Sequence, residues 1–339
     1  MKEKATSNGR FVWCKIIIIF LVLFMILLPS TGFAITYSFE SIDGKYTARG
    51  INDNGDIVGA SGVVGYDGYL LTGGSFYNVE TLPVSSLVQA VHDINTSNNM
   101  TGWYDNNPDG VLGYRGVYDT GSNSYTSFDS FQYEHPTLGL RQTYAYGIND
   151  DGWIVGMCRY PKNPGDNEAQ SHAFLLIGEL FTIIDPPGYD AASAKGINDL
   201  GQIVGTYYDT GNSTWAGFLL DYGIPSYSSI IFSGSTETQL YDINNDGWIV
   251  GEYTDSSNVR HGFVRIDGVF TEMSFPDADF TIPYGINSDG WIVGQYWKDQ
   301  TYTAFLAKPV SEAIPEPTTT LLIGFGLLGI AGFRRKLLR

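Results

Sequence analysis

Residues 147–156 read GINDDGWIVG, a short polar turn between two segments that favour β-strand. Asn and Asp tolerate left-handed backbone angles, and Gly adopts them without steric cost. The Trp-Ile-Val run that follows is aromatic and β-branched, which is typical of a half-buried strand. The stretch therefore predicts a tight turn between two antiparallel strands.

The same turn recurs five more times along the chain. The other copies are GINDNGDIVG (50–59), DINTSNNMTG (93–102), GINDLGQIVG (196–205), DINNDGWIVG (242–251) and GINSDGWIVG (285–294). The shared asparagines are Asn52, Asn95, Asn149, Asn198, Asn244 and Asn287, and they are 43, 54, 49, 46 and 43 residues apart. A period in the forties predicts repeated β units, as in propeller blades. The second copy is degenerate, which leaves an error of register open there.

Each repeat holds about four short strands. The first leads into the turn, and the second is the Trp-Ile-Val-Gly strand. The third is an apolar stretch such as HAFLLI (172–177) or HGFVRI (261–266), and the fourth is aromatic, as in GELFTIIDPPG (178–188). Short strands separated by turns about every ten residues predict an all-β fold.

The two ends of the repeat array indicate how it closes. The last repeat stops at AFLAKPV (304–310) without a fourth strand, and ITYSFESIDG (35–44) resembles LFTIIDPPG (180–188). We therefore expect residues 35–310 to form a six-bladed β-propeller of about 24 strands, closed by its N-terminal strand, which leaves no long exposed edge. A linear β-solenoid is the alternative, and it would need capping units and a shorter repeat.

The repeat resembles a named family. The pattern GINDxGxIVGxY…HGFL…GxFTxID is similar to the extracellular HAF repeat, whose triplet stands here at His172-Ala173-Phe174, with a variant at 261–263. The resemblance covers residues 35 to about 308, although DGYLL (67–71) and RGVYD (115–119) lack the histidine. It implies a β-rich secreted protein and no agreed activity.

The N-terminus has the layout of a secretory signal peptide. A basic stretch is followed by apolar residues 16–28, then Pro29, then small residues that predict cleavage after Ala34. Thirteen apolar residues are short for a permanent span. An uncleaved membrane anchor is the alternative for residues 1–34.

The C-terminus has three parts in order. Residues 311–317 form a linker that ends in Pro315-Glu316-Pro317, residues 318–333 are apolar and predict a transmembrane helix, and residues 334–339 are a basic tail. A buried core helix fits poorly because the segment has no polar face. The trailing positive charges would hold the end in the cytoplasm.

This C-terminal pattern resembles the PEP-CTERM sorting signal. The motif residues are Pro315, Glu316, Pro317, Arg334 and Arg335. The resemblance implies sorting in a Gram-negative bacterium that makes extracellular polysaccharide, with an exosortase-type membrane protease as partner. The protein would be anchored transiently in the inner membrane and then reach the cell surface or extracellular matrix.

Composition narrows the function. Only 16% of residues are charged, 14% are aromatic, and the net charge is −17 although both ends are basic. Without those ends the middle has 11 basic against 35 acidic residues, which disfavours a nucleic-acid partner. We interpret the acidity as a solubility feature.

One turn has the oxygen spacing that opens a calcium loop. Asp242, Asn244 and Asp246 precede Gly247, but the twelfth position is Tyr253 and not Glu. Most copies of the turn also lack the first ligand. We therefore interpret these segments as turns held by side-chain bonds to the backbone, with calcium at 242–246 as a weaker hypothesis and no other cofactor expected.

Three tryptophans, Trp153, Trp248 and Trp291, recur at one place in the repeat. Packing between neighbouring blades is the first interpretation of this position. A platform that stacks on sugars is the alternative.

No catalytic motif is present in the sequence. His172 and His261 occupy equivalent positions and predict a hydrogen-bonding feature, and Cys158 predicts a buried apolar residue. No nucleophile elbow, P-loop or metal-ligand spacing of histidines occurs. The sequence thus favours a non-enzymatic structural or adhesive protein beside exopolysaccharide. A glycan-binding module that uses rim Trp, Tyr and Asp, and a glycoside-active enzyme with a carboxylate pair in the channel, are the alternatives.

Overall fold

The structure is a computed structural model, and it describes residues 35–62, 68–79, 89–105, 110–117, 124–128, 141–160, 170–189 and 191–310. The chain divides into two compact parts, Met1–Thr36 and Tyr37–Arg339, and nearly all the described residues belong to the second. In the described ranges no helix is long and apolar enough to span a bilayer. The predicted signal peptide, sorting helix and basic tail lie outside those ranges.

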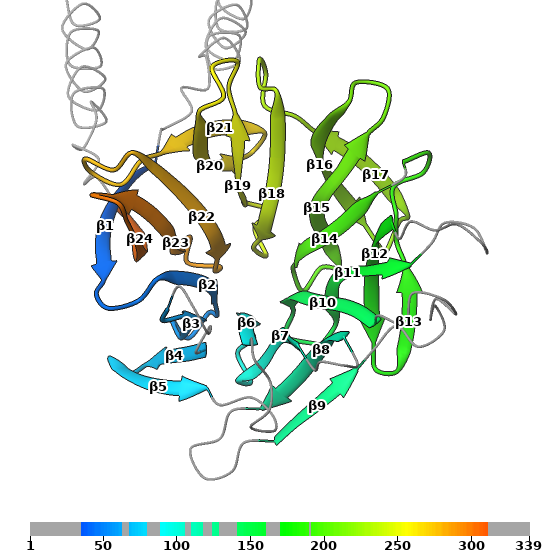
Figure 1. The fold of residues 1–339 in the computed structure, drawn as a ribbon, viewed down its shortest axis with the longest axis horizontal. Helices are drawn as coiled ribbons and strands as arrows, with labels where there is room; N and C mark the ends of the chain where they lie inside the picture. The colour runs from blue at the N-terminus through cyan, green and yellow to red at the C-terminus, as the bar shows by residue number, and fades with distance from the viewer. Residues whose placement is uncertain are drawn as a thin grey trace, which may run out of the picture. The chain divides into compact units, whose positions relative to one another are not determined.

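Each sequence repeat is called a unit here, and the units are numbered 1 to 6 by their asparagines. Units 1 to 5 each contribute four strands and unit 6 contributes three (Figure 1). The first strands of the six units are β2 (Thr47–Ile51), β6 (Gln89–Ile94), β10 (Arg141–Ile148), β14 (Ala192–Ile197), β18 (Glu237–Ile243) and β22 (Phe280–Ile286). The second strands are β3 (Ile57–Ala60), β7 (Asn99–Asp105), β11 (Ile154–Tyr160), β15 (Gln202–Asp209), β19 (Ile249–Thr254) and β23 (Ile292–Lys298).

The outer half of each unit holds the other two strands. The third strands are β4 (Gly68–Thr72), β8 (Gly110–Val117), β12 (Gln170–Ile177), β16 (Thr214–Asp221), β20 (Arg260–Ile266) and β24 (Thr301–Val310). The fourth strands are β5 (Ser75–Val79), β9 (Ser124–Phe128), β13 (Leu180–Ile183), β17 (Ser226–Ile230), β21 (Val269–Met273) and, for the last unit, β1 (Thr36–Ile42).

The fold is an all-β propeller, but the prediction of six separate blades is wrong. The strands form five hydrogen-bonded sheets, four of them with four strands and one with eight. Units 2 and 3 share the large sheet because β10 pairs in parallel with β8, Arg141 opposite Gly110 and Gln142 opposite Val111. In every unit the first and second strands pair antiparallel, as the turn chemistry predicts.

The first strands form the inner circle of the propeller, and each contacts the first strand of the next unit (Figure 1). The circle is closed because β22 also contacts β2. The predicted closure by the N-terminal strand is confirmed, since β1 pairs with β24 in the order β1-β24-β23-β22. A linear solenoid would have no such contact between its first and last units.

The hydrophobic core is divided into clusters, most of them between neighbouring units. Between units 3 and 4, for example, Val155 and Leu175 pack with Ile203 and Phe218. Tyr37 and Phe39 of β1 pack against the cluster that joins units 5 and 6, so the closing strand contributes apolar area as well as hydrogen bonds.

Candidate functional site

The repeated asparagine builds its own turn and also links its unit to the next. The Oδ1 atom of Asn52 accepts from the backbone N of Asn54 at 3.1 Å and of Asp56 at 2.9 Å. Its Nδ2 atom donates to the carbonyl oxygen of Asn95 in unit 2 at 3.0 Å. An aspartate would lack this donor, so the amide is required for the link.

The same link is made by all six units. Further bonds run from Asn95 to Asn149, Asn149 to Asn198, Asn198 to Asn244, Asn244 to Asn287 and Asn287 back to Asn52. All six side chains are buried. The degenerate second unit keeps the predicted register, because Asn95 Oδ1 accepts from Ser97 and Asn99. In a closed ring of six, units 1 and 4, 2 and 5, and 3 and 6 lie opposite each other.

Three residues before each asparagine, the first strand has a β-bulge. The pairing register skips one residue there in every unit, for example between Ala48 and Gly50. The six bulged residues are Arg49, His92, Tyr146, Lys195, Tyr241 and Tyr284. Bulges turn side chains out of the regular pleat. All six side chains line one cavity of about 280 Å³.

Two carboxylates also face this cavity, Asp93 in unit 2 and Asp242 in the opposite unit 5. Asp93 accepts from the backbone N of Ile94 and of Ile148 in unit 3, each at 2.9 Å. Asp242 accepts from Ile243 at 2.8 Å and from Ile286 in unit 6 at 2.9 Å. Burial raises the pKa of Asp242 to about 7. Burial, and then the charge of Asp242, raises the pKa of Asp93 well above its usual range.

Arg49 and Lys195 project into the cavity from opposite units, 1 and 4. The guanidinium carbon of Arg49 lies 5.1 Å from the ring centre of Tyr284, and Nζ of Lys195 lies 3.5 Å from that of Tyr146. Each cation is therefore stacked on a tyrosine of the preceding unit. Burial, and then the charge of Arg49, lowers the pKa of Lys195 to about 7.

Two polar contacts fix further side chains at the cavity. Trp103 Nε1 donates to Nε2 of His92 at 3.0 Å, which places the imidazole proton on Nδ1. Burial, and then the charges of Arg49 and Lys195, keeps the pKa of His92 well below its usual value. In unit 5 the hydroxyl of Tyr241 donates to Glu252 at 2.7 Å, and Arg260 donates two hydrogen bonds to the same carboxylate.

The three tryptophans predicted from the repeat lie outside this cavity, at the junctions between units. The rings of Trp153, Trp248 and Trp291 approach the turn glycines of the following units, Gly201, Gly290 and Gly55. All three are half-buried. Their position is that of inter-unit packing, and sugar stacking on them stays a prediction.

The residues of the calcium hypothesis have separate roles in the fold. Asp242 faces the channel, the Asn244 amide links unit 5 to unit 6, and the backbone N of Asp246 donates to Asn244. Among the described residues no group of three His, Cys, Asp or Glu side chains is arranged to hold a metal ion. Calcium at this turn stays a prediction.

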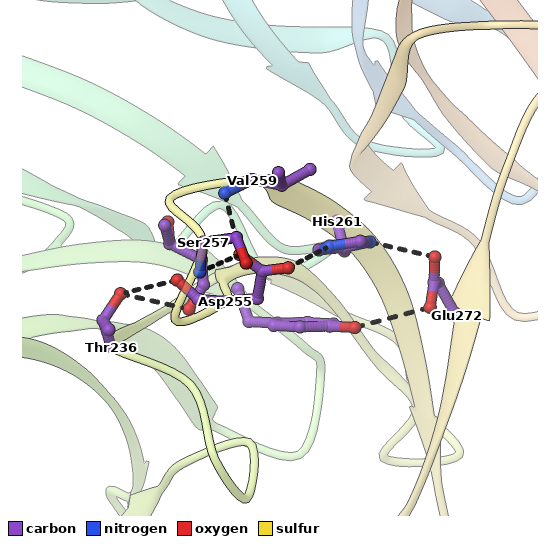
Figure 2. A network of polar contacts seen from close by, with 8 residues as sticks. Thr236, Asp255, Ser257, Val259, His261 and Glu272 are labelled. Carbon is purple, nitrogen blue, oxygen red and sulfur yellow. Dashed lines mark hydrogen bonds and ion pairs between the residues drawn. The ribbon is translucent and has the colours of Figure 1, made fainter.

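The equivalent histidines make the predicted hydrogen bonds. His172 Nδ1 lies 2.6 Å from Asp185 Oδ2. His261 lies between two carboxylates, 3.0 Å from Glu272 and 3.3 Å from Asp255 (Figure 2). The hydroxyl of Tyr253 also donates to Glu272. Cys158 is buried, in agreement with its predicted apolar role.

The cavity is not predicted by the residues that are identical between repeats, because the bulged position holds Arg, His, Lys and Tyr in turn. The usable signal was variation at one position within an otherwise constant frame, directly before Gly-Ile-Asn or Asp-Ile-Asn.

Comparison with known proteins supports two parts of the chain separately. Residues 313–336 match the family model described as the PEP-CTERM protein-sorting motif. The motif implies export, membrane anchoring before processing, and processing by exosortase, a membrane protein. No curated protein matches the chain in sequence.

Solved structures match the propeller. TolB from Acinetobacter baumannii is 13% identical with a TM-score of 0.50, covering 76% of this chain and 64% of its own. The β-propeller domain of the Trilobed protease from Pyrococcus furiosus is 12% identical with a TM-score of 0.50, covering 80% and 85%. A sialidase from Trypanosoma rangeli is 11% identical with a TM-score of 0.47, covering 80% and 55%. The chain thus spans less than two thirds of TolB and of the sialidase. The likenesses to TolB and to the Trilobed protease domain show the fold alone.

Proposed function

We propose that this chain is an exported, non-enzymatic β-propeller that is associated with extracellular polysaccharide and binds a glycan at its channel cavity. An exosortase-type system delivers it to the cell surface or matrix through Pro315-Glu316-Pro317 and the basic residues Arg334 and Arg335. The resemblance to HAF repeats is consistent with a secreted role. Binding at the channel replaces the rim tryptophans as the favoured glycan site.

The bulged position carries this proposal. Gly, Ile and Asn recur around it because packing and the asparagine links demand them. The bulged residue itself differs between units. The six bulged side chains are half-buried, and they line one cavity. A position that varies while its frame repeats is typical of a binding surface displayed on a scaffold. Tyr and Trp around the cavity supply stacking faces and hydroxyl groups suited to sugars.

The state of the channel carboxylates favours binding over hydrolysis. Each oxygen of Asp93 and Asp242 accepts a backbone N–H. One bond of each carboxyl group, from Ile148 to Asp93 and from Ile286 to Asp242, joins neighbouring units. We assign this pair a structural role in place of acid–base catalysis.

A binding assay with the full chain tests the proposal. Exopolysaccharide fragments from the host are titrated into the wild type, Tyr146→Ala and Trp153→Ala. We expect Tyr146→Ala to lose binding and Trp153→Ala to retain it while folded, with no shortened glycan released by the wild type. Binding lost only in Trp153→Ala would move the site to the tryptophans, and shortened products would establish an enzyme.

The sorting step has its own test. Replacing Pro315-Glu316-Pro317 by alanines in the host is expected to leave the uncut chain in the membrane fraction. Mass spectrometry of the mature C-terminus compares the wild type with this variant. An identical mature C-terminus and identical location in both would refute exosortase sorting through this motif.

A further inference from the structure

The chemistry of the channel cavity goes further than glycan binding in general. Building on the proposed function, we infer that the cavity binds a sugar acid of the uronate type, with its carboxylate held between Arg49 and Lys195.

Within the described parts of the chain, Arg49 and Lys195 lack the partners that buried cations normally have. Both are half-buried at the cavity, and no ion pair or hydrogen bond joins either side chain to any residue in the described parts of the chain. Within those parts of the chain, each cation has a cation–π contact with the face of one tyrosine ring. Cations removed from water are costly unless an anion compensates them, and an anionic ligand would supply that compensation.

The two carboxyl groups in the same cavity, Asp93 and Asp242, do not supply the anion that would compensate Arg49 and Lys195. Both oxygens of Asp93 and of Asp242 are bonded to backbone amides. Burial also raises the pKa of both carboxyl groups, which favours their neutral forms. Burial, and then the charges of Arg49 and Lys195, keep the pKa of His92 well below its usual value, so the imidazole adds no charge of its own. The positive character that suits a carboxylate comes from Arg49 and Lys195, which line the cavity.

The two cations lie on opposite sides of the channel in matching surroundings. Arg49 in unit 1 stacks on Tyr284 in unit 6, and Lys195 in unit 4 stacks on Tyr146 in unit 3. Each cation is covered on one side by a tyrosine ring, and both cations line the same cavity. A planar guanidinium binds a carboxylate with two parallel hydrogen bonds, and the ammonium adds a third.

The rest of the cavity suits the ring of a sugar. Aromatic side chains line it, with the faces of Tyr146 and Tyr284 covered by the cations and the hydroxyl of Tyr241 bonded to Glu252. Trp103 and Tyr144 supply further aromatic surface. A volume of about 280 Å³ lies at the lower limit of ligand pockets, which favours one sugar residue over a long oligosaccharide. The ligand is therefore a single uronate, either free or at the end of an acidic polysaccharide.

The test is a titration of the full chain with glucuronate, glucose, acetate and an oligoglucuronate, followed by calorimetry and by ligand-observed NMR. We expect glucuronate to bind and to raise the melting temperature, and glucose and acetate to bind at least tenfold more weakly. Arg49→Met and Lys195→Met should each weaken glucuronate binding about tenfold or more, because each removes charge-assisted hydrogen bonds. Equal binding of the oligomer indicates recognition of a polymer end, and binding of the monomer alone indicates a free sugar acid.

Lys45→Met is the matched control. Lys45 also lies over aromatic rings, those of Tyr69 and Phe76, but outside the cavity. The Lys45→Met variant should bind glucuronate like the wild type. Lys195→Met removes a desolvated charge and is expected to fold, which a melting curve checks.

Four results overturn the inference. Glucuronate affinity unchanged in both Arg49→Met and Lys195→Met removes the proposed carboxylate site. Equal affinity for acetate makes the cavity a site for simple anions. Neutral sugars that bind as tightly as glucuronate, with loss in Tyr146→Ala, refute the acidic ligand but leave the proposed function intact. If no sugar of either kind and no host polysaccharide binds, both proposals fail.

Discussion

Asn287 Nδ2 donates to the carbonyl oxygen of Asn52 at 3.1 Å and so joins two residues that are 235 positions apart. It is the same bond that links every other pair of consecutive units, made here between the last unit and the first. The ring is therefore closed twice, at its centre by this amide and at its periphery by β1. The two closures use different residues, so mutations can test them separately.

Asn52→Asp is expected to destabilise the fold by at least about 1–3 kcal/mol, because it leaves the carbonyl of Asn95 facing a second acceptor in a buried site. The new carboxylate would also lie near Asp56, whose Oδ2 is 3.2 Å from the amide now present. Asn54→Asp is the matched control, since its amide makes the same kind of bond, to Thr96 in unit 2, but is exposed. Chemical denaturation measures both, and equal losses would contradict the structural role of the asparagine links.

Removal of residues 35–43 should lower the melting temperature of the whole propeller, because it opens the last sheet and uncovers the cluster beneath β1. The single substitution Phe39→Ala tests the same contact. Phe39 packs on Phe275 and Phe305 with ring centres 5.6 Å away in each case. We expect a loss of about 2–3 kcal/mol, below the full value for a completely buried Phe.

Phe76→Ala provides the comparison for Phe39→Ala. Phe76 is on β5, the fourth strand of unit 1, but its side chain is 46% exposed. It should cost clearly less. A melting temperature unchanged by the deletion would show that β1 is dispensable for closure.

The repeat frame was predictable because its causes are local. The Asx-type turns follow from Asn and Gly within ten residues, and the four strands of each unit follow from apolar runs between turns. Closure by β1 was predictable from the missing fourth strand of the last repeat. Joining of units 2 and 3 was not, since it depends on two residue pairs between β8 and β10, far apart in the sequence. The cavity also escaped prediction, because opposition of Arg49 and Lys195 exists only once the ring is closed.

Trp153→Ala is expected to cost about 2–3 kcal/mol, since its half-buried ring packs on the next unit, near Gly201 and edge-on to Tyr222 at 6.0 Å. Thermal unfolding measures the loss. Leu200→Ala, in the same turn as Gly201 but 66% exposed, is the control and should change stability little. A fully stable Trp153→Ala variant that fails to bind glycan would favour the stacking platform over packing.

His261 is expected to titrate above its usual pKa. Burial alone lowers the pKa, but hydrogen bonds to Glu272 and Asp255, together with their charges, raise it further than burial lowers it. Because the folded pKa exceeds the unfolded one, the histidine stabilises the fold fully below about pH 6.5 and loses that contribution as pH rises through its folded pKa. Glu272→Gln should lower the pKa of His261 in an NMR titration, whereas Asp267→Asn, an exposed change in the same unit, should not. An unchanged pKa in Glu272→Gln would exclude that carboxylate as the cause.

The shifted pKa values of two side chains in the channel predict that their contribution to stability first falls and then rises with pH. Asp242 has a raised pKa of about 7, so the folded state binds more protons than the unfolded one between about pH 4 and 7, and the free energy of unfolding falls over that range. Lys195 has a lowered pKa of about 7, so the unfolded state binds more protons between about pH 7 and 10.5, and the free energy of unfolding rises there. Asp242→Asn should flatten the acid side of the curve and Lys195→Met the alkaline side.

Denaturation curves at a series of pH values measure these slopes, with Asp246→Asn, at an exposed position of the same turn, as the control. Asp93 keeps part of the acid slope in Asp242→Asn, because its own pKa is raised by burial, so the double variant with Asp93→Asn should be the flattest. The slopes depend on pH alone and are separate from the loss of the hydrogen bond to Ile286, which lowers stability at every pH. An acid slope that is the same in the wild type and the double variant would mean that neither channel carboxyl is protonated in the fold. Two ionised carboxylates would balance the charges of Arg49 and Lys195, and the cavity would then lack the positive charge on which the uronate proposal depends.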